Sequence, residues 1–178
     1  APVYIRYTVP IVYACYGTAS EIKPIPDNQN IEFTYYDETG SRVLGNGESY
    51  SIPQINQTMR YVVVGSMEGC DVSKKVTVFA LSNPTLRVTE DVEVCKGANA
   101  ALSVVSPASG TNYYWGGIGS NEGTTYTATN VLDKVVIPVY AVKNYSSTSS
   151  SAPACTPSKV VTVTPVETPN FQISSSAE

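Results

Sequence analysis

Hydrophobic and polar residues alternate along short stretches of this chain. Ile31, Phe33 and Tyr35 fall on one face of residues 31–35 and polar side chains on the other, and residues 159–163 are similarly β-branched and half polar. A period of two is typical of a strand with one buried face. Glycine and proline, 12 of each, interrupt these stretches at the ~8–12-residue spacing of turns in a β-sandwich. No stretch has the apolar period of an amphipathic helix, so the pattern predicts an all-β protein.

The chain also contains an internal repeat. Residues 76–89 align with residues 161–174, and residues 15–20 align with residues 95–100. The offset between the copies changes only where the composition is typical of loops. A repeat of this length indicates two similar structural units rather than one large domain.

The repeat places the domain boundaries. We predict two β-sandwich domains, residues 1–82 and 83–166, joined near Leu81–Pro84. Residues 167–178 match the first strand of the second copy, so we expect them to begin a further repeat of a longer array or to form a disordered tail. Residues 146–151 are a serine-rich run that buries no apolar area, and we expect a flexible hairpin tip there.

Four cysteines occupy equivalent positions in the two copies. The even number and the repetition predict one disulfide within each domain, Cys15 with Cys70 and Cys95 with Cys155. A bridge closing a loop of this size adds ~4 kcal/mol to the stability of a small domain on the chain-entropy model. Zinc ligation needs ligands at close spacing, and a catalytic thiol needs a histidine partner, so both alternatives are weaker. Disulfides imply an oxidising compartment, which predicts a secreted or cell-surface protein.

Charge and composition exclude several functions. The net charge is −4, so no excess of basic residues is available for nucleic acid. Histidine is absent, which removes the commonest general base and metal ligand. The longest apolar stretches fall far short of the ~20 residues of a membrane span, so we expect no direct membrane insertion.

No residues form a recognisable catalytic constellation, and we predict neither an enzyme, nor a metal site, nor a cofactor. Asp37 and Glu38, or Glu90, Asp91 and Glu93, resemble carboxylate pairs or calcium ligands, but solvated turns explain them better. A glycine-rich stretch near the middle of the chain lacks the lysine and the helix that a phosphate loop requires.

Several motifs together resemble a known family, the Ig-like domains of large Bacteroidetes surface and secreted proteins, which occur beside gliding-motility or type IX secretion C-terminal domains. The first copy follows the family pattern over nearly its whole length, with Tyr35 where tryptophan is usual. The second copy departs from it in the hairpin after Trp115. The matching segments of the first copy are Cys15–Gly17, Tyr35–Gly40, Leu44–Gly45, Tyr50–Ile55, Thr58–Val64 and Glu68–Ser73, and those of the second are Cys95–Gly97, Trp115, Tyr126–Ala128, Cys155 and Ser158.

The resemblance implies two Ig-like sandwiches in a tandem array outside a Gram-negative cell, where family members act as spacers and adhesive segments. Tyr35 and Trp115 each stand 20 residues after the first cysteine of their copy. Because alternate residues of these strands are aromatic, we expect both side chains to fill the sandwich cores.

Two functions follow from these observations. The first is a non-catalytic adhesin or stalk segment whose partners are the neighbouring repeats of the same long chain and, through adhesion, a glycan or a surface protein. The alternative is a carbohydrate-binding accessory module of a secreted enzyme. For glycan contact the candidates are Tyr36, Tyr114 and Tyr145, which fall on the predicted outward face or in a loop.

Overall fold

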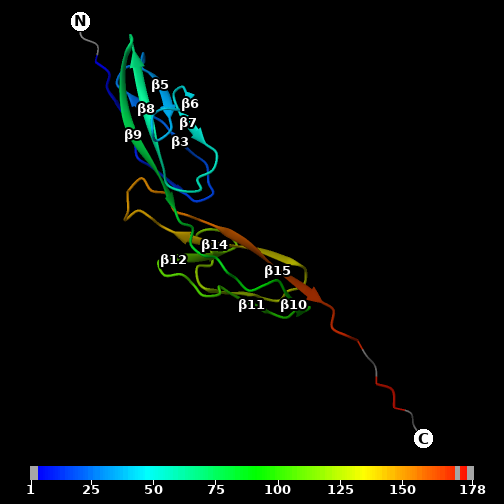
Figure 1. Ribbon diagram of the computed structural model, residues 1–178. Helices are drawn as coiled ribbons and strands as arrows, with labels where there is room; N and C mark the ends of the chain where they lie inside the picture. The colour runs from blue at the N-terminus through cyan, green and yellow to red at the C-terminus, as the bar shows by residue number, and fades with distance from the viewer. Residues whose placement is uncertain (1–3, 171–172, 176–178) are drawn as a thin grey trace. The chain divides into compact units, whose positions relative to one another are not determined.

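Strands are the only regular elements in residues 4–170 and 173–175, the part of the chain that the computed structural model describes (Figure 1). The chain divides into two units. Unit 1 comprises the residues up to Asn83 together with Asn144–Cys155, and unit 2 comprises Pro84–Lys143 and the residues from Thr156 onward. The fold is therefore all-β, as predicted. Nothing helical in the described residues has the length and apolar character of a membrane-spanning segment.

Unit 1 is built around a five-stranded sheet of order β2-β9-β8-β5-β6. Strand β2 runs parallel to β9, and the other neighbours are antiparallel. Two further pairs, β3-β7 and β1-β4, complete the unit. Its strands are β1 (Tyr7–Thr8), β2 (Val12–Cys15), β3 (Ser20–Ile22), β4 (Ile25–Pro26), β5 (Glu32–Tyr36), β6 (Val43–Asn46), β7 (Tyr50–Ile52), β8 (Met59–Met67) and β9 (Cys70–Leu81).

Unit 2 repeats this plan with one strand fewer in its main sheet, whose order is β10-β15-β14-β12. Strand β10 runs parallel to β15, as β2 does to β9, and β11 pairs with β13. Its strands are β10 (Val92–Cys95), β11 (Ala100–Ser103), β12 (Thr111–Trp115), β13 (Thr125–Ala128), β14 (Val135–Lys143) and β15 (Ser158–Val166).

Each unit buries one face of its main sheet against the smaller strand pair. In unit 1 the buried cluster takes Ile22 from β3 and Ile52 from β7 together with inward residues of β5, β8 and β9. In unit 2 it takes Leu102 from β11 and Ala128 from β13 together with inward residues of β12, β14 and β15. Side chains alternate between the two faces of each strand, so every second residue of a strand points into the core and the others point to the outer surface. Each main sheet places the last two strands of its unit beside β5 or β12, opposite the separate pair β3-β7 or β11-β13, and this is the Ig-like sandwich plan. Unit 1 adds β6 at the edge of its main sheet.

An aromatic pair lies at the same place in both cores. Tyr35 and Trp115 are fully buried. Tyr35 stacks on Tyr50 with ring centroids 5.5 Å apart, and Trp115 stacks on Tyr126 at 5.7 Å. The repeat seen in the sequence is thus a repeat of the core.

The polar atom of each core aromatic donates a hydrogen bond to a glycine carbonyl. The Tyr35 hydroxyl donates to the oxygen of Gly47 at 3.0 Å, and the Trp115 Nε1 donates to that of Gly123 at 2.9 Å. Both glycines have positive φ, 117° and 149°, which L-residues with a side chain rarely adopt. The Tyr35 hydroxyl and the Trp115 indole thus reach equivalent glycine acceptors in the two units.

The Cys-x-Gly motif forms the same turn in both units. Gly17 and Gly97 both have a φ of 84°. The Gly17 amide donates to the carbonyl of Ile55 at 2.7 Å, and the Gly97 amide donates to that of Val131 at 2.8 Å. The motif is therefore explained by backbone geometry at the glycine.

The segment between β14 and β15 departs from the predicted domain division. Residues 144–155 fall within the predicted second domain, yet the structure groups Asn144–Cys155 with unit 1. Turn hydrogen bonds organise this segment, from the Thr148 amide to the Tyr145 carbonyl at 2.9 Å and from the Ala152 amide to the Ser149 carbonyl at 3.1 Å. The prediction for residues 167–178 lies partly outside the described residues.

The predicted disulfide pairing is wrong. The bridge joins Cys15 to Cys155, with Cα atoms 5.6 Å apart, and Cys70 and Cys95 are exposed free thiols. In unit 1, Cys15 pairs in register with Leu81 at the far end of β9 from Cys70, about 36 Å away along the strand. A disulfide requires Cα atoms within ~7 Å.

Distance along the strand also excludes the second predicted bridge, Cys95 with Cys155. Cys95 pairs with Val166, the last residue of β15, whereas Cys155 precedes the first residue of that strand, Ser158. The strand alone separates these ends by about 26 Å. Because β2 runs parallel to β9 and β10 runs parallel to β15, the two cysteines of each copy lie at opposite ends of the last strand of their unit.

Counting thiols tests the observed connectivity. Alkylation of the folded protein without reductant is expected to modify two cysteines, Cys70 and Cys95, and alkylation after reduction in denaturant to modify four. A non-reducing peptide map should contain the Cys15 peptide linked to the Cys155 peptide. Linkage of Cys15 to Cys70, or of Cys95 to Cys155, would contradict the structure.

Candidate functional site

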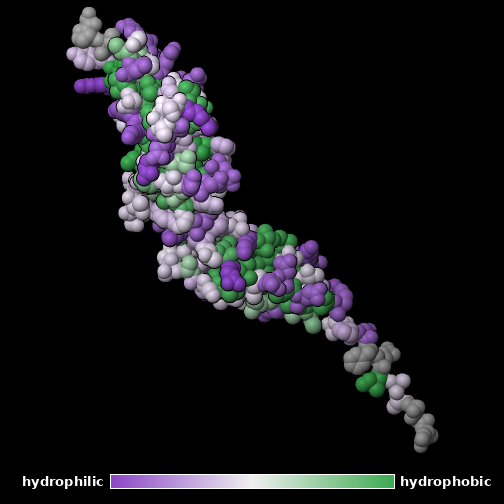
Figure 2. Space-filling view, viewed as in Figure 1, coloured by the Kyte–Doolittle hydropathy of each residue, from purple (hydrophilic) through white to green (hydrophobic). Residues whose placement is uncertain are grey.

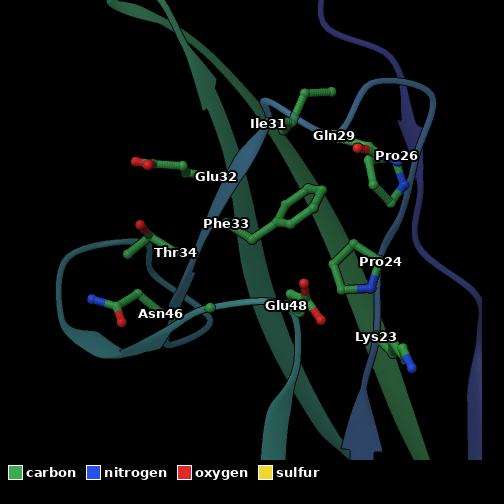
Figure 3. Close-up of a pocket in the computed structure, with 11 residues that line it drawn as sticks. Lys23, Pro24, Pro26, Gln29, Ile31, Glu32, Phe33, Thr34, Asn46 and Glu48 are labelled. Atoms are coloured by element: carbon green, nitrogen blue, oxygen red, sulfur yellow. The ribbon is translucent and has the colours of Figure 1, made fainter.

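A groove of about 970 Å³ opens beside β5 in unit 1 (Figure 3). The ring of Phe33 points toward Pro24 and Pro26 and forms an apolar wall, whereas Glu32 and Thr34 point to the opposite side of the strand. Its other lining residues include Lys23, Gln29, Asn46 and Glu48. The groove is thus lined by an apolar wall and by positively and negatively charged side chains, Lys23 and Glu48.

A second, shallower depression of about 610 Å³ lies on the outer face of the five-stranded sheet. Tyr36 borders it from β5, Val62 from β8 and Lys75 from β9, and these three are neighbours in register. Asp71 lines it as well and accepts a hydrogen bond from Ser66 at 2.6 Å. One of the candidate glycan-binding tyrosines therefore lies in a depression with a lysine and a carboxylate.

One row of side chains connects the two depressions. Glu32, Thr34 and Tyr36 are alternate residues of β5 and so share the outer face of the strand. Glu32 and Thr34 line the groove, and Tyr36 lines the depression. The outer row of β5 therefore reaches the rim of the groove at Glu32 and Thr34 and the depression at Tyr36.

The other two candidate tyrosines lie elsewhere. Tyr114 is half-buried on β12 in unit 2, where it is paired directly with Tyr140 of β14. Tyr145 belongs to unit 1, and its hydroxyl donates to the carbonyl of Ser82 at 2.5 Å. Tyr145 also packs against the buried cluster of Cys15, Leu81 and Cys155. The three tyrosines therefore do not converge on one site within either unit.

Apolar side chains reach the surface of unit 2 over β14 and β15 (Figure 2). Val136 and Val160 expose 56% and 57% of their surfaces. Ile118 and Leu132, which lie in loops of the same unit, are also exposed. This face differs from the equivalent face of unit 1, which carries Lys75 at the corresponding sheet position.

Two of the carboxylates that resembled catalytic or calcium-binding pairs, Asp37 and Asp91, support the backbone. Asp37 accepts hydrogen bonds from the Thr39 hydroxyl at 2.7 Å and from the Ser41 amide at 3.2 Å. The Thr39 bond, together with backbone amides, lowers the pKa of Asp37 below its usual value. Asp91 accepts from the Thr162 amide at 2.8 Å. Within the described residues no three His, Cys, Asp or Glu side chains are grouped to hold a metal ion.

No family model matches the chain, and no match is found among curated proteins. Among solved structures, the chain is similar to the fibronectin(III)-like modules of Clostridium thermocellum CbhA, with 13% identity and a TM-score of 0.40 over 91% of this chain and 95% of that one. It is also similar to titin domains Z1Z2 in complex with telethonin, with 9% identity and a TM-score of 0.37 over 95% and 100% of the two chains.

A third similar structure contains three N-terminal domains of the bacteriophage RB49 outer capsid protein Hoc, with 14% identity and a TM-score of 0.41 over 92% of this chain and 70% of that one. These likenesses identify no ligand or partner. The assignment of both units to the Ig-like sandwich rests on their sheets and cores.

Tyr35 provides a pH test of the core geometry. Burial, with a smaller contribution from the charge of Glu21, raises the pKa of Tyr35 from 10.0 to about 12. The stabilisation from neutral Tyr35 is therefore complete below pH 10 and is lost as the pH rises from 10 toward 12. We expect this group to lower the free energy of unfolding by about 1.4 kcal/mol per pH unit in that window.

Urea unfolding followed by circular dichroism between pH 10 and 12 measures this slope. The Tyr35→Phe variant should show a shallower decline than the wild type, and Trp115→Phe, which alters the equivalent residue of unit 2 without a titrating group, should retain the wild-type slope. Equal slopes for wild type and Tyr35→Phe would show that Tyr35 ionises normally.

Proposed function

We propose that this chain is a non-catalytic spacer and adhesive segment of a secreted or cell-surface protein, built of Ig-like repeats. The observation that supports it is the recurrence of one core design, the stacked aromatic pair with its glycine acceptor, in both units. Repetition of one module is how elongated arrays are built. The partners would then be the neighbouring repeats and a receptor at the end of the array.

Two further observations support a place outside the cytoplasm. A disulfide with a fully buried Cys155 indicates an oxidising compartment. The sequence motifs resemble those of Ig-like domains in Bacteroidetes surface and secreted proteins, some of which accompany type IX secretion. A spacer in that setting needs stability and length rather than a catalytic centre.

Small-angle X-ray scattering tests the spacer function. A compact globule of 178 residues has a radius of gyration of about 16 Å, and a spacer should clearly exceed this value, with a skewed distance distribution. The measurement should be repeated at several concentrations to exclude dimers. A radius near that of a compact globule would contradict the proposal.

A second function, glycan binding, is favoured by the depression around Tyr36. Tyr36 lines this depression near Lys75, with Ser73 and Asp71 further along the same face, so the surface offers stacking together with hydrogen bonds, the combination that sugar rings need. This would make the segment an accessory binding module rather than a passive spacer.

A polysaccharide pull-down and a glycan array test this function. Tyr36→Ala should weaken binding about two- to twelvefold, given the ~0.5–1.5 kcal/mol that an aromatic contact contributes. Tyr4→Ala is the matched control because Tyr4 is 73% exposed in unit 1 and does not line the depression. Absence of binding to any polysaccharide, or equal loss in both variants, would exclude this surface as the site.

A further inference from the structure

The Cys15–Cys155 bridge closes most of the chain into one covalent loop. The two cysteines are 140 residues apart in the sequence. The loop contains residues 16–154, and these include β3–β9 of unit 1 and β10–β14 of unit 2. Only β1, β2 and β15 lie outside it.

The chain passes from one unit to the other three times, after Asn83, after Lys143 and after Cys155. The bridge lies within unit 1, because that unit includes both Cys15 and Cys155. It joins Cys15, the last residue of β2, to Cys155, and the chain enters unit 2 for the last time directly after Cys155. A covalent route from the N-terminal end to the C-terminal end therefore exists that bypasses everything between the two cysteines.

This covalent route determines which residues can be extended when the two ends of the chain are pulled. Tension applied to the two ends passes through the shortest covalent connection, which is residues 1–15, the bridge and residues 155–178. At ~3.4 Å per extended residue, the route is about 130 Å long when taut, whereas the bypassed loop would add about 470 Å. Stretching can strip β2 from β9 and β15 from its neighbours, but it cannot extend the chain that forms most of both cores.

The surroundings of the bridge protect it. Cys155 is fully buried and Cys15 is 7% exposed. Leu81 joins them in a buried cluster, and Tyr13 and Tyr145 pack against it. The Tyr145 hydroxyl donates to the Ser82 carbonyl and holds the segment before Cys155 on unit 1. Restricted access slows thiol–disulfide exchange, so the bridge is suited to persist in the folded protein.

We propose that the Cys15–Cys155 disulfide is a mechanical bypass that confines extension under tension to residues 1–15 and 155–178. The two remaining cysteines have no part in it, because both are exposed free thiols outside the bridge. The inference concerns the response of the chain to force and stands independently of the spacer and glycan-binding functions proposed above.

Single-molecule force spectroscopy on the full chain, held by handles at its two ends, tests the bypass. The oxidised protein should release no more than about 130 Å of contour length, and the Cys15→Ser/Cys155→Ser double variant should release about 470 Å more. The Cys70→Ser/Cys95→Ser double variant is the matched control and should behave as the wild type does. Equal contour lengths for the wild type and the Cys15→Ser/Cys155→Ser variant would overturn the proposal.

A second measurement applies if the Cys15→Ser/Cys155→Ser variant does not fold. The wild type is held at constant force after its first opening, and a phosphine reductant is added. Cleavage of the bridge should release the remaining loop, up to about 470 Å, only after the reductant arrives. Full extension before reduction would also overturn the proposal. Scattering and glycan-binding results leave both outcomes unaffected, so failure of the spacer function is distinguishable from failure of the bypass.

Discussion

The hydrogen bond from a buried aromatic side chain to a glycine carbonyl is the constraint that both sandwiches share. Tyr35 donates to Gly47 and Trp115 donates to Gly123. A large ring fills the space between the two sheets, but its polar atom must find a partner once water is excluded. The glycine turn supplies that partner, so the ring, the turn and the following strand are positioned together in each unit.

The disulfide adds a constraint of a different kind. Packing stabilises each unit separately, whereas the Cys15–Cys155 bridge ties the segment between β14 and β15 to the end of β2. Asn144–Cys155 belongs to unit 1 for this reason, although unit 2 precedes and follows it in the sequence. The serine-rich run lengthens this connection in the second copy and lets it reach the body of unit 1.

Much of the fold could be predicted because its causes are local. Alternation in residues 31–35 indicates a strand with a buried Tyr35, and Cys-x-Gly indicates a turn that needs positive φ at Gly17 and Gly97. The candidate site was less predictable. The outward position of Tyr36 follows from alternation, but Lys75 and Asp71, which line the same depression, come from a strand far along the sequence. Only strand pairing brings these residues together.

The sequence by itself determined the all-β class, the two repeats and the aromatic position in each core, since these follow from periodicity and from residues close together in the chain. The tertiary structure decided which cysteines meet. Equivalent positions suggested a bridge within each copy, but parallel pairing of β2 with β9 and of β10 with β15 places those cysteines at opposite ends of the last strands. Disulfide formation depends on distance in space, and that distance is set by strand direction and loop length, which the repeat does not encode.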